Sequence, residues 1–445
     1  MSTKLAVLAA VVPLVCGASV LAQAPAKIFP YAYQQLVLDN GFKVIVIPME
    51  SPGLVAYYSV VRTGSRDEYE PGHSGFAHFF EHMMFRGTKN FPGAVYDRLV
   101  TEMGANANAY TSNDITCYHL EIGTEDLEKT MEVESDRFKN LSYPEDDFKT
   151  EAGAVHGEYL KSLANPFFVL RENLANTAFD VHTYKHTVIG FKQDIEAMPT
   201  MYQYSLSFFN RYYRPENVVL VLVGDIKPDA AFALAKKYYG DWQKGYVPAQ
   251  VPVEPEQMGE RRLEAAFDGK TLPIFAIGYK GLGFASDNIA VASCLLLGNL
   301  AFGETSDIYN KLVLDQQRVE FISADFSPNR DPGLLTIYSR IKDPNDVAGV
   351  ESEIDSAITS YQTRPVDESR LNDLKSNIRY GFLMGLDTPG KVAGALTDVV
   401  SITGGIEALD RFYGTLDRVT SKDIMDAANR FLVREKRTVV LVKGR

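Results

Sequence analysis

A weak internal repeat constrains the fold of this chain more than any other feature. A helical segment at 202–212 leads into an unbroken apolar run at 218–223, and the same succession returns at 423–431 and 437–442. Unbroken apolar runs of this length are typical of fully buried strands. Because 445 residues are also too many for one ordinary core, we expect two similar domains.

A proline-rich stretch separates the two copies. Three prolines fall close together between positions 248 and 255, among polar residues with neither a helical nor an alternating pattern. We therefore predict a linker at 246–259. The sequence then divides into an N-terminal domain at 23–245 and a C-terminal domain at 260–445.

The first residues carry the features of a secretory signal peptide. Lys4 supplies a positive start, residues 5–15 form an apolar core, and Val20-Leu21-Ala22 resembles a cleavage site. We predict a signal peptide at 1–22 and export, most simply to a bacterial periplasm. The apolar core is too short to span a bilayer, and we expect no membrane helix in the rest of the chain.

Composition excludes several classes of protein. Apolar residues make up 46% of the chain and charged residues 23%, as in globular rather than disordered proteins. The net charge of −12 argues against nucleic acid as a partner. Removal of the signal would leave Cys117 and Cys294, which lie far apart, so we expect two small core residues and no structural disulfide.

The segment 72–87 contains the strongest chemical signal. Its apolar residues do not alternate, so we expect a short buried helix from about Ser74. On that helix His78 and His82 lie one turn apart, and Glu81 lies on the same side. Buried imidazoles and carboxylates need partners, and one metal ion satisfies all three groups. The order His-x-x-Glu-His is the inverzincin signature; the alternative is two histidines placed by chance in a core helix.

A second helix, expected at 148–162, offers a further ligand. Glu151 and Glu158 lie seven residues apart, about two turns, and so share one face. Catalytic zinc sites take three protein ligands and leave a position for water. We predict Glu158 as the third ligand and Glu151 as a supporting carboxylate; the alternative is that both are solvated surface acids.

An extended stretch of small and polar residues at 106–111 precedes a strand expected at 116–122. It suits either an edge strand that forms the lip of a peptide-binding site or an ordinary polar loop, and its sequence favours neither. His119, inside the following strand, is expected to be a packed histidine rather than a ligand. The candidate substrate-binding residues are Asn106, Ala107, Asn108, Ala109 and Tyr110.

Together these elements resemble the pitrilysin–insulysin group of inverzincin metallopeptidases, nearest the subgroup with mitochondrial processing peptidase and two-subunit bacterial members. The resemblance covers essentially the whole chain after the signal. It is carried by His78-Phe79-Phe80-Glu81-His82, the pair Glu151 and Glu158, Asn108-Ala109-Tyr110-Thr111, and Arg214-Pro215-Glu216-Asn217 through Gly224-Asp225.

The resemblance implies a fold, a cofactor and residue roles. The fold would be α+β, of the α/β sandwich type, with two homologous domains of mixed sheet plus helices that form half of a clamshell chamber. The activity would be that of a zinc metalloendopeptidase acting on short or unfolded peptides, which add as a strand at 106–111. One zinc ion would be held by His78, His82 and Glu158. Glu81 would be the general base, and Glu151 would be a supporting carboxylate.

One departure from the family pattern concerns the second half. Members that hold substrate with that half carry an arginine and, seven residues later, a tyrosine after a helix like 308–312; here Val313 and Glu320 take those places. Neither side chain donates a hydrogen bond to a peptide carbonyl. Because the chain is also about half as long as the single-chain members, we expect a homologous subunit that supplies this pair, in a heterodimer. A non-catalytic scaffold, or a zinc protein that holds peptides without cutting them, is the alternative.

Overall fold

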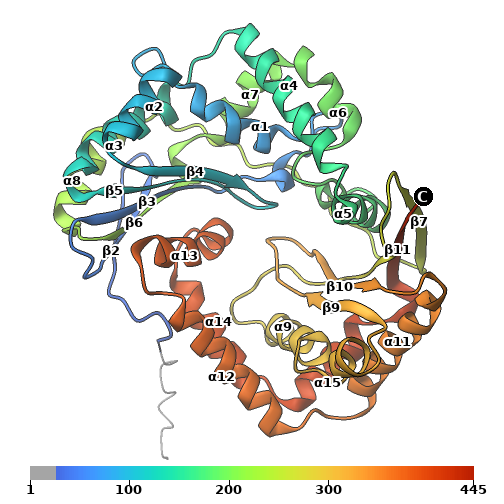
Figure 1. Ribbon diagram of the computed structural model, residues 1–445. Helices are drawn as coiled ribbons and strands as arrows, with labels where there is room; N and C mark the ends of the chain where they lie inside the picture. Colours follow the sequence, from blue (N-terminus) through green and yellow to red (C-terminus); the bar gives the residue numbers. More distant parts are fainter. Residues whose placement is uncertain (1–26) are drawn as a thin grey trace, which may run out of the picture.

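The computed structural model describes residues 27–445 and shows two α/β units, each built on one sheet (Figure 1). The first half of the chain, coloured blue to green, forms the six-stranded sheet, and the second half forms the five-stranded one. The predicted α+β class with two similar units is confirmed. The predicted signal peptide at 1–22 lies outside the described residues.

The first sheet is mixed, with the strand order β1-β2-β6-β3-β5-β4. β2 and β6 run parallel, and the other neighbouring pairs are antiparallel. β6 is buried along its whole length, as its unbroken apolar run predicted. The strands are β1 Gln34–Val37, β2 Lys43–Pro48, β3 Leu54–Val61, β4 Asn106–Thr111, β5 Thr116–Gly123 and β6 Val218–Gly224.

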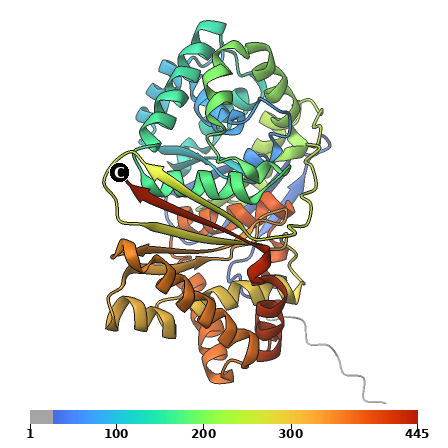
Figure 2. The same cartoon turned by 90° about the vertical axis from the view of Figure 1, so that its right-hand side faces the viewer.

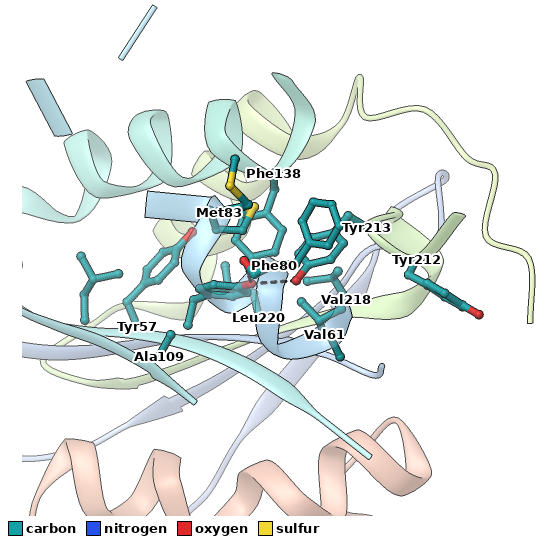
Figure 3. Close-up of a cluster of buried hydrophobic side chains, with 14 of the residues drawn as sticks. Tyr57, Val61, Phe80, Met83, Ala109, Phe138, Tyr212, Tyr213, Val218 and Leu220 are labelled. Atoms are coloured by element: carbon teal, nitrogen blue, oxygen red, sulfur yellow. Dashed lines mark hydrogen bonds between the residues drawn. The ribbon is translucent and has the colours of Figure 1, made fainter. Parts of the chain in front are cut away.

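Side chains alternate across the first sheet and so divide it between two cores. One face packs against helices of the same half, including α1, α3, α4, α7 and α8. Figure 3 shows part of this core, with Phe80 and Met83 of α1 above Ala109 of β4. The helices of the first half are α1 Phe76–Met83, α2 Gly93–Glu102, α3 Leu127–Asn140, α4 Glu145–Ser162, α5 Pro166–Ala178, α6 Lys192–Ala197, α7 Tyr202–Tyr212 and α8 Pro228–Tyr239.

The second sheet repeats most of the first. Its order, β7-β11-β8-β10-β9, matches β2-β6-β3-β5-β4, and in both the first pair is parallel and the rest antiparallel. β7 and the C-terminal strand β11 lie side by side in Figure 2. The repeat seen in the sequence is therefore a repeat of topology.

The elements of the second half begin after the predicted linker. Its strands are β7 Arg261–Phe267, β8 Ile274–Lys280, β9 Val319–Asp325, β10 Leu334–Ile341 and β11 Arg437–Gly444. Its helices are α9 Ile289–Phe302, α10 Asp307–Tyr309 with a π-helical continuation Asn310–Asp315, α11 Val347–Thr363, α12 Glu368–Met384, α13 Pro389–Thr403, α14 Glu407–Arg418 and α15 Ser421–Phe431.

Each half lends one helix to the sheet of the other half. α5 precedes the linker, yet its Leu170 and Leu174 pack against Ile274 and Val440 of the second sheet. α13 follows the linker, and its Leu396 packs against the outer face of the first sheet. Each sheet is therefore closed on its second face by a helix from the other half.

The segment predicted as the linker, 246–259, contains no helix or strand, but it is fixed in place. Glu254 accepts hydrogen bonds from the backbone N–H groups of residues 180–182 and from Nζ of Lys280 at 2.9 Å. Although burial opposes the effect, these donors lower the pKa of Glu254 to about 2. The domain boundaries stay a prediction. The helix α5 belongs to the N-terminal domain by sequence but packs on the sheet of the C-terminal domain.

The helices and strands predicted from the sequence lie within a few residues of their predicted positions. In the segment 164–198, α5 comes first and mostly irregular backbone follows it up to α6. The side chain of Asn165 caps α5 by accepting from the N–H of Phe167, and Pro166 opens the helix. This start signal is local and is visible in the sequence.

The expectation that no later stretch is long and apolar enough to cross a membrane is wrong by length and composition. The helical stretch Ile289–Asp315 meets both criteria. In the structure, 61% of its most apolar window is buried, and α9 lies in the second core. The free thiols of Cys117 and Cys294 are also buried, as predicted.

Replacement of Leu396 by alanine should destabilise the first half, although Leu396 belongs to the second. Leu396 is fully buried in the core shared by α13 and the first sheet, and loss of such a side chain lowers the free energy of unfolding by about 2–5 kcal/mol. The single tryptophan, Trp242, lies in the first core and reports urea unfolding of that half by fluorescence. Met384→Ala, at an exposed site on α12, is the control. An unchanged transition for Leu396→Ala would contradict the shared packing.

Candidate metal centre

The helix α1 is held at its N-terminus by two buried carboxylates. Glu68 accepts hydrogen bonds from the backbone N–H groups of Gly75 and Ala77 at 2.7 and 2.6 Å. Asp194 accepts from the N–H and the hydroxyl of Ser74 at 3.1 and 2.6 Å. Carboxylates at this end satisfy free N–H groups and complement the helix dipole. They fix the start of the helix that carries the histidines.

Three side chains from two helices converge on one point. His78 and His82 come from α1 and Glu158 from α4, and their ligand atoms lie within 4.8 Å of one another. Oε2 of Glu158 lies 3.6 Å from Nε2 of His78 and 3.5 Å from Nε2 of His82. These separations are too long for hydrogen bonds, but they roughly match two ligands each ~2.0–2.2 Å from one tetrahedral zinc ion. The structure thus brings together the three ligands selected from the sequence.

The protonation and the hydrogen bonding of His78 fit those of a metal ligand. Burial and the neighbouring His82 lower the pKa of His78 to about 4, so the imidazole is neutral near pH 7 and keeps a lone pair. Nδ1 of His78 is buried and has no hydrogen-bond partner among residues 27–445, while Nε2 points toward Glu158. A buried imidazole without partners is costly, and coordination through Nε2 offsets part of that cost.

Glu151 supports His82 from the side away from the cluster. Its Oε1 lies 2.9 Å from Nδ1 of His82, and its Oε2 accepts from Nε of Arg86 at 2.7 Å. The hydrogen bonds to His82 and Arg86 lower the pKa of Glu151, and that carboxylate in turn raises the pKa of His82. A carboxylate on one ring nitrogen directs the other nitrogen toward a metal and makes it a better ligand. Arg86 is a member of this chain of contacts that the sequence did not reveal.

Glu81 lies beside the cluster without joining it. The side chain is half-buried, and Oγ1 of Thr111 donates a hydrogen bond to its Oε2 at 2.7 Å. Burial raises the pKa of Glu81, against the opposing effect of the Thr111 hydroxyl. A carboxylate with a raised pKa next to a candidate metal site is suited to proton transfer.

The segment 106–111 forms β4, which lies at one edge of the first sheet. Of the two alternatives for this segment, it is therefore an edge strand and not a polar loop. β4 pairs with β5 on one side and has no strand on the other among residues 27–445. A cavity of about 500 Å³ beside it is lined by Asn108 and Ala109 of β4 and by Glu81 and His82 of α1, among others. An extended chain added to this edge lies next to the candidate metal site.

The fold and the site together define a class of protein: two repeated α/β units, of which the first carries a His-x-x-Glu-His helix and a distant glutamate. Residues 51–191 match the family model described as insulinase (peptidase family M16), and residues 202–378 match that of the peptidase M16 inactive domain. The chain belongs to peptidase family M16. The sequence has no histidine after His186, in keeping with the description of the second model.

Proteins similar to this chain include zinc proteases. Zinc protease PqqE of Helicobacter pylori is 29% identical over 446 residues, covering 98% of this chain and 97% of that protein. The beta subunit of mitochondrial-processing peptidase from Caenorhabditis elegans is 25% identical over 428 residues, covering 91% and 88%. The crystal structure of a protease from Helicobacter pylori matches with a TM-score of 0.85 at 25% identity, covering 93% of this chain and 100% of that one. The predicted family is confirmed.

Loss of Arg86 should weaken zinc binding. In Arg86→Leu the carboxylate of Glu151 keeps only His82 as a partner and orients it less firmly, so we expect zinc affinity to fall by about 10–100-fold. Competition with a chromophoric zinc chelator measures the affinity. Arg98→Leu, at an exposed site on α2, is the matched control. Equal affinity in the two variants would show that Arg86 does not support the site.

Proposed function

We propose that this chain is a zinc metalloendopeptidase with one zinc ion held by His78, His82 and Glu158. The observation that carries the proposal is the convergence of these three side chains from two helices beside a carboxylate, Glu81, that is not one of them. The zinc proteases among the similar proteins support the choice of metal. Export to a bacterial periplasm is part of the proposal and rests on the sequence of residues 1–22.

In the proposed hydrolysis, the metal ion and the side chains have separate roles. Zinc, when bound, supplies a Lewis acid and a water molecule whose pKa falls toward ~7. Glu81 accepts a proton from the attacking water and passes it to the leaving amine. Glu151 holds the ring of His82 in place during this transfer. β4 keeps the peptide backbone extended, with the scissile bond within reach of Glu81.

Strand addition at β4 selects substrates by conformation. A partner strand needs an extended backbone with free N–H and C=O groups, so short or unfolded peptides fit and folded proteins do not. The proposed binding residues contribute backbone groups, and the asparagine side chains on β4 point away from the core. They are Asn106, Ala107, Asn108, Ala109 and Tyr110.

We propose that a homologous subunit completes the substrate site. Val313 carries no hydrogen-bond donor, and the carboxylate of Glu320 lies 3.4 Å from Nη1 of Arg340. Arg318, the arginine nearest to them in sequence, donates to Asp346 at 2.6 and 2.8 Å and is thereby occupied. The similar protein from Caenorhabditis elegans is named as one subunit of a peptidase, which agrees with this division.

Replacement of Glu81 by glutamine separates an enzyme from a protein that only holds peptides. The amide cannot accept the proton of water, so kcat should fall by about 10²–10⁴-fold while zinc content and peptide affinity stay unchanged. A fluorogenic peptide, metal analysis and peptide binding measure the three quantities. Glu102→Gln, at the exposed end of α2, is the control. If wild-type protein binds zinc and peptide but cuts nothing, alone or with a partner, the chain is a holding or scaffold protein.

The heterodimer is tested by the specific activity of the purified chain, alone and mixed with a homologous subunit from the same cells. Because no donor is available at positions 313 and 320, we expect peptide hydrolysis only in the mixture. Light scattering of the mixture should show a complex of about twice the mass. Full activity of the chain alone would support the proposed peptidase and contradict the proposed heterodimer.

A further inference from the structure

We propose that Thr111 is a positioning residue, whose hydroxyl holds the carboxylate of Glu81 in register with the strand that binds the peptide. The inference rests on the proposed function and names a residue that couples two of its parts. Thr111 is the last residue of β4, and Glu81 lies near the end of α1. One hydrogen bond therefore joins the proposed peptide-binding strand to the proposed base.

Within the described part of the chain, that hydrogen bond is the one polar contact of the Glu81 carboxylate. Oγ1 of Thr111 lies 2.7 Å from Oε2 of Glu81, and among residues 27–445 no other hydrogen bond or ion pair reaches this carboxylate. A glutamate side chain has three rotatable bonds, so without this donor the carboxylate is free to turn. With Oε2 bound to Thr111, the other oxygen, Oε1, remains to accept a proton from water.

The alternation of β4 explains why Thr111 alone is available for this role. Ala107, Ala109 and Thr111 share one face of the strand, the face that packs on α1. The two alanines offer no polar group and leave space beside the helix. Tyr110, on the opposite face, donates instead to Oγ1 of Thr397 on α13. Thr111 is thus the one hydroxyl that β4 directs to α1.

The distance between β4 and α1 is fixed by contacts that do not involve Thr111. The hydroxyl of Tyr118 on β5 donates to the backbone C=O of Phe80 at 2.8 Å, one residue before Glu81. Tyr118 in turn pairs with Ala109 of β4. The N–H of Ser112 donates to the C=O of Ile115 and closes the β4–β5 hairpin. Removal of the Thr111 hydroxyl therefore frees the carboxylate while the backbone around it stays in place.

The decisive variant is Thr111→Val, which removes the hydroxyl and keeps the shape. We expect kcat on a fluorogenic peptide to fall by about 10–100-fold, because a misplaced catalytic group costs up to about 10²-fold in rate. KM should stay within about twofold, and zinc content and affinity should match those of wild type. Thr111→Ser, which restores the donor, should recover kcat to within about threefold.

Thr116→Val is the matched control. Thr116 lies opposite Thr111 in the hairpin, and its hydroxyl donates to the backbone C=O of Thr63 at 2.9 Å, away from Glu81. Loss of this buried hydroxyl should lower the thermal unfolding temperature without changing kcat. A fall in kcat that follows stability in both variants would mean that Thr111 acts only through the fold, and would overturn the proposal.

The remaining outcomes separate this inference from the proposed function. If wild-type protein cuts peptides and Thr111→Val does so at the same kcat, the positioning role is wrong and the peptidase stands. Loss of zinc from Thr111→Val, or no recovery in Thr111→Ser, also overturns it. If Thr111→Val does not fold, Thr111→Ala decides by the same measurements. If wild-type protein does not cut peptides under any condition, the proposed function fails first.

Discussion

The first half of the protein depends on the burial of the short helix α1, which carries two histidines and a glutamate among apolar residues. A buried helix needs partners for its free N–H groups, and buried imidazoles and carboxylates need partners of their own. Glu68 and Asp194 satisfy the N-terminus, and Tyr118 binds a carbonyl group farther along. Because these contacts fix the helix backbone, the Nε2 atoms of His78 and His82 both face Glu158, while Nδ1 of His82 faces Glu151.

The proposed third ligand links this site to the second half of the chain. Glu158 lies on α4, and only a short turn separates α4 from α5, which packs on the second sheet. The hydroxyl of Tyr159, the residue after Glu158, donates to Glu172 of α5 at 2.9 Å. The second half therefore contributes to the candidate centre, because it holds the C-terminal end of the helix that carries one of the proposed ligands.

Local features of the site were predictable because they depend on neighbours along one helix. The spacing of His78 and His82 places both on one face of any helix, and the spacing of Glu151 and Glu158 does the same. Contacts between elements were not predictable in the same way. Thr111 reaches a carboxylate 30 residues away, and its role depends on the face of β4 that turns toward α1. No local pattern encodes such a pairing.

By itself, the sequence determined the elements, the repeat and the residue types able to bind a metal, because periodicity and composition act over one or two helical turns. The tertiary structure alone decided that β4 lies at a sheet edge, that α5 and α13 each close the sheet of the other half, and that Arg86 and Thr111 contact the site. Strand order and helix docking follow from burial of apolar faces that belong to distant segments. That burial is a property of the assembled cores, and so a single stretch of sequence does not reveal it.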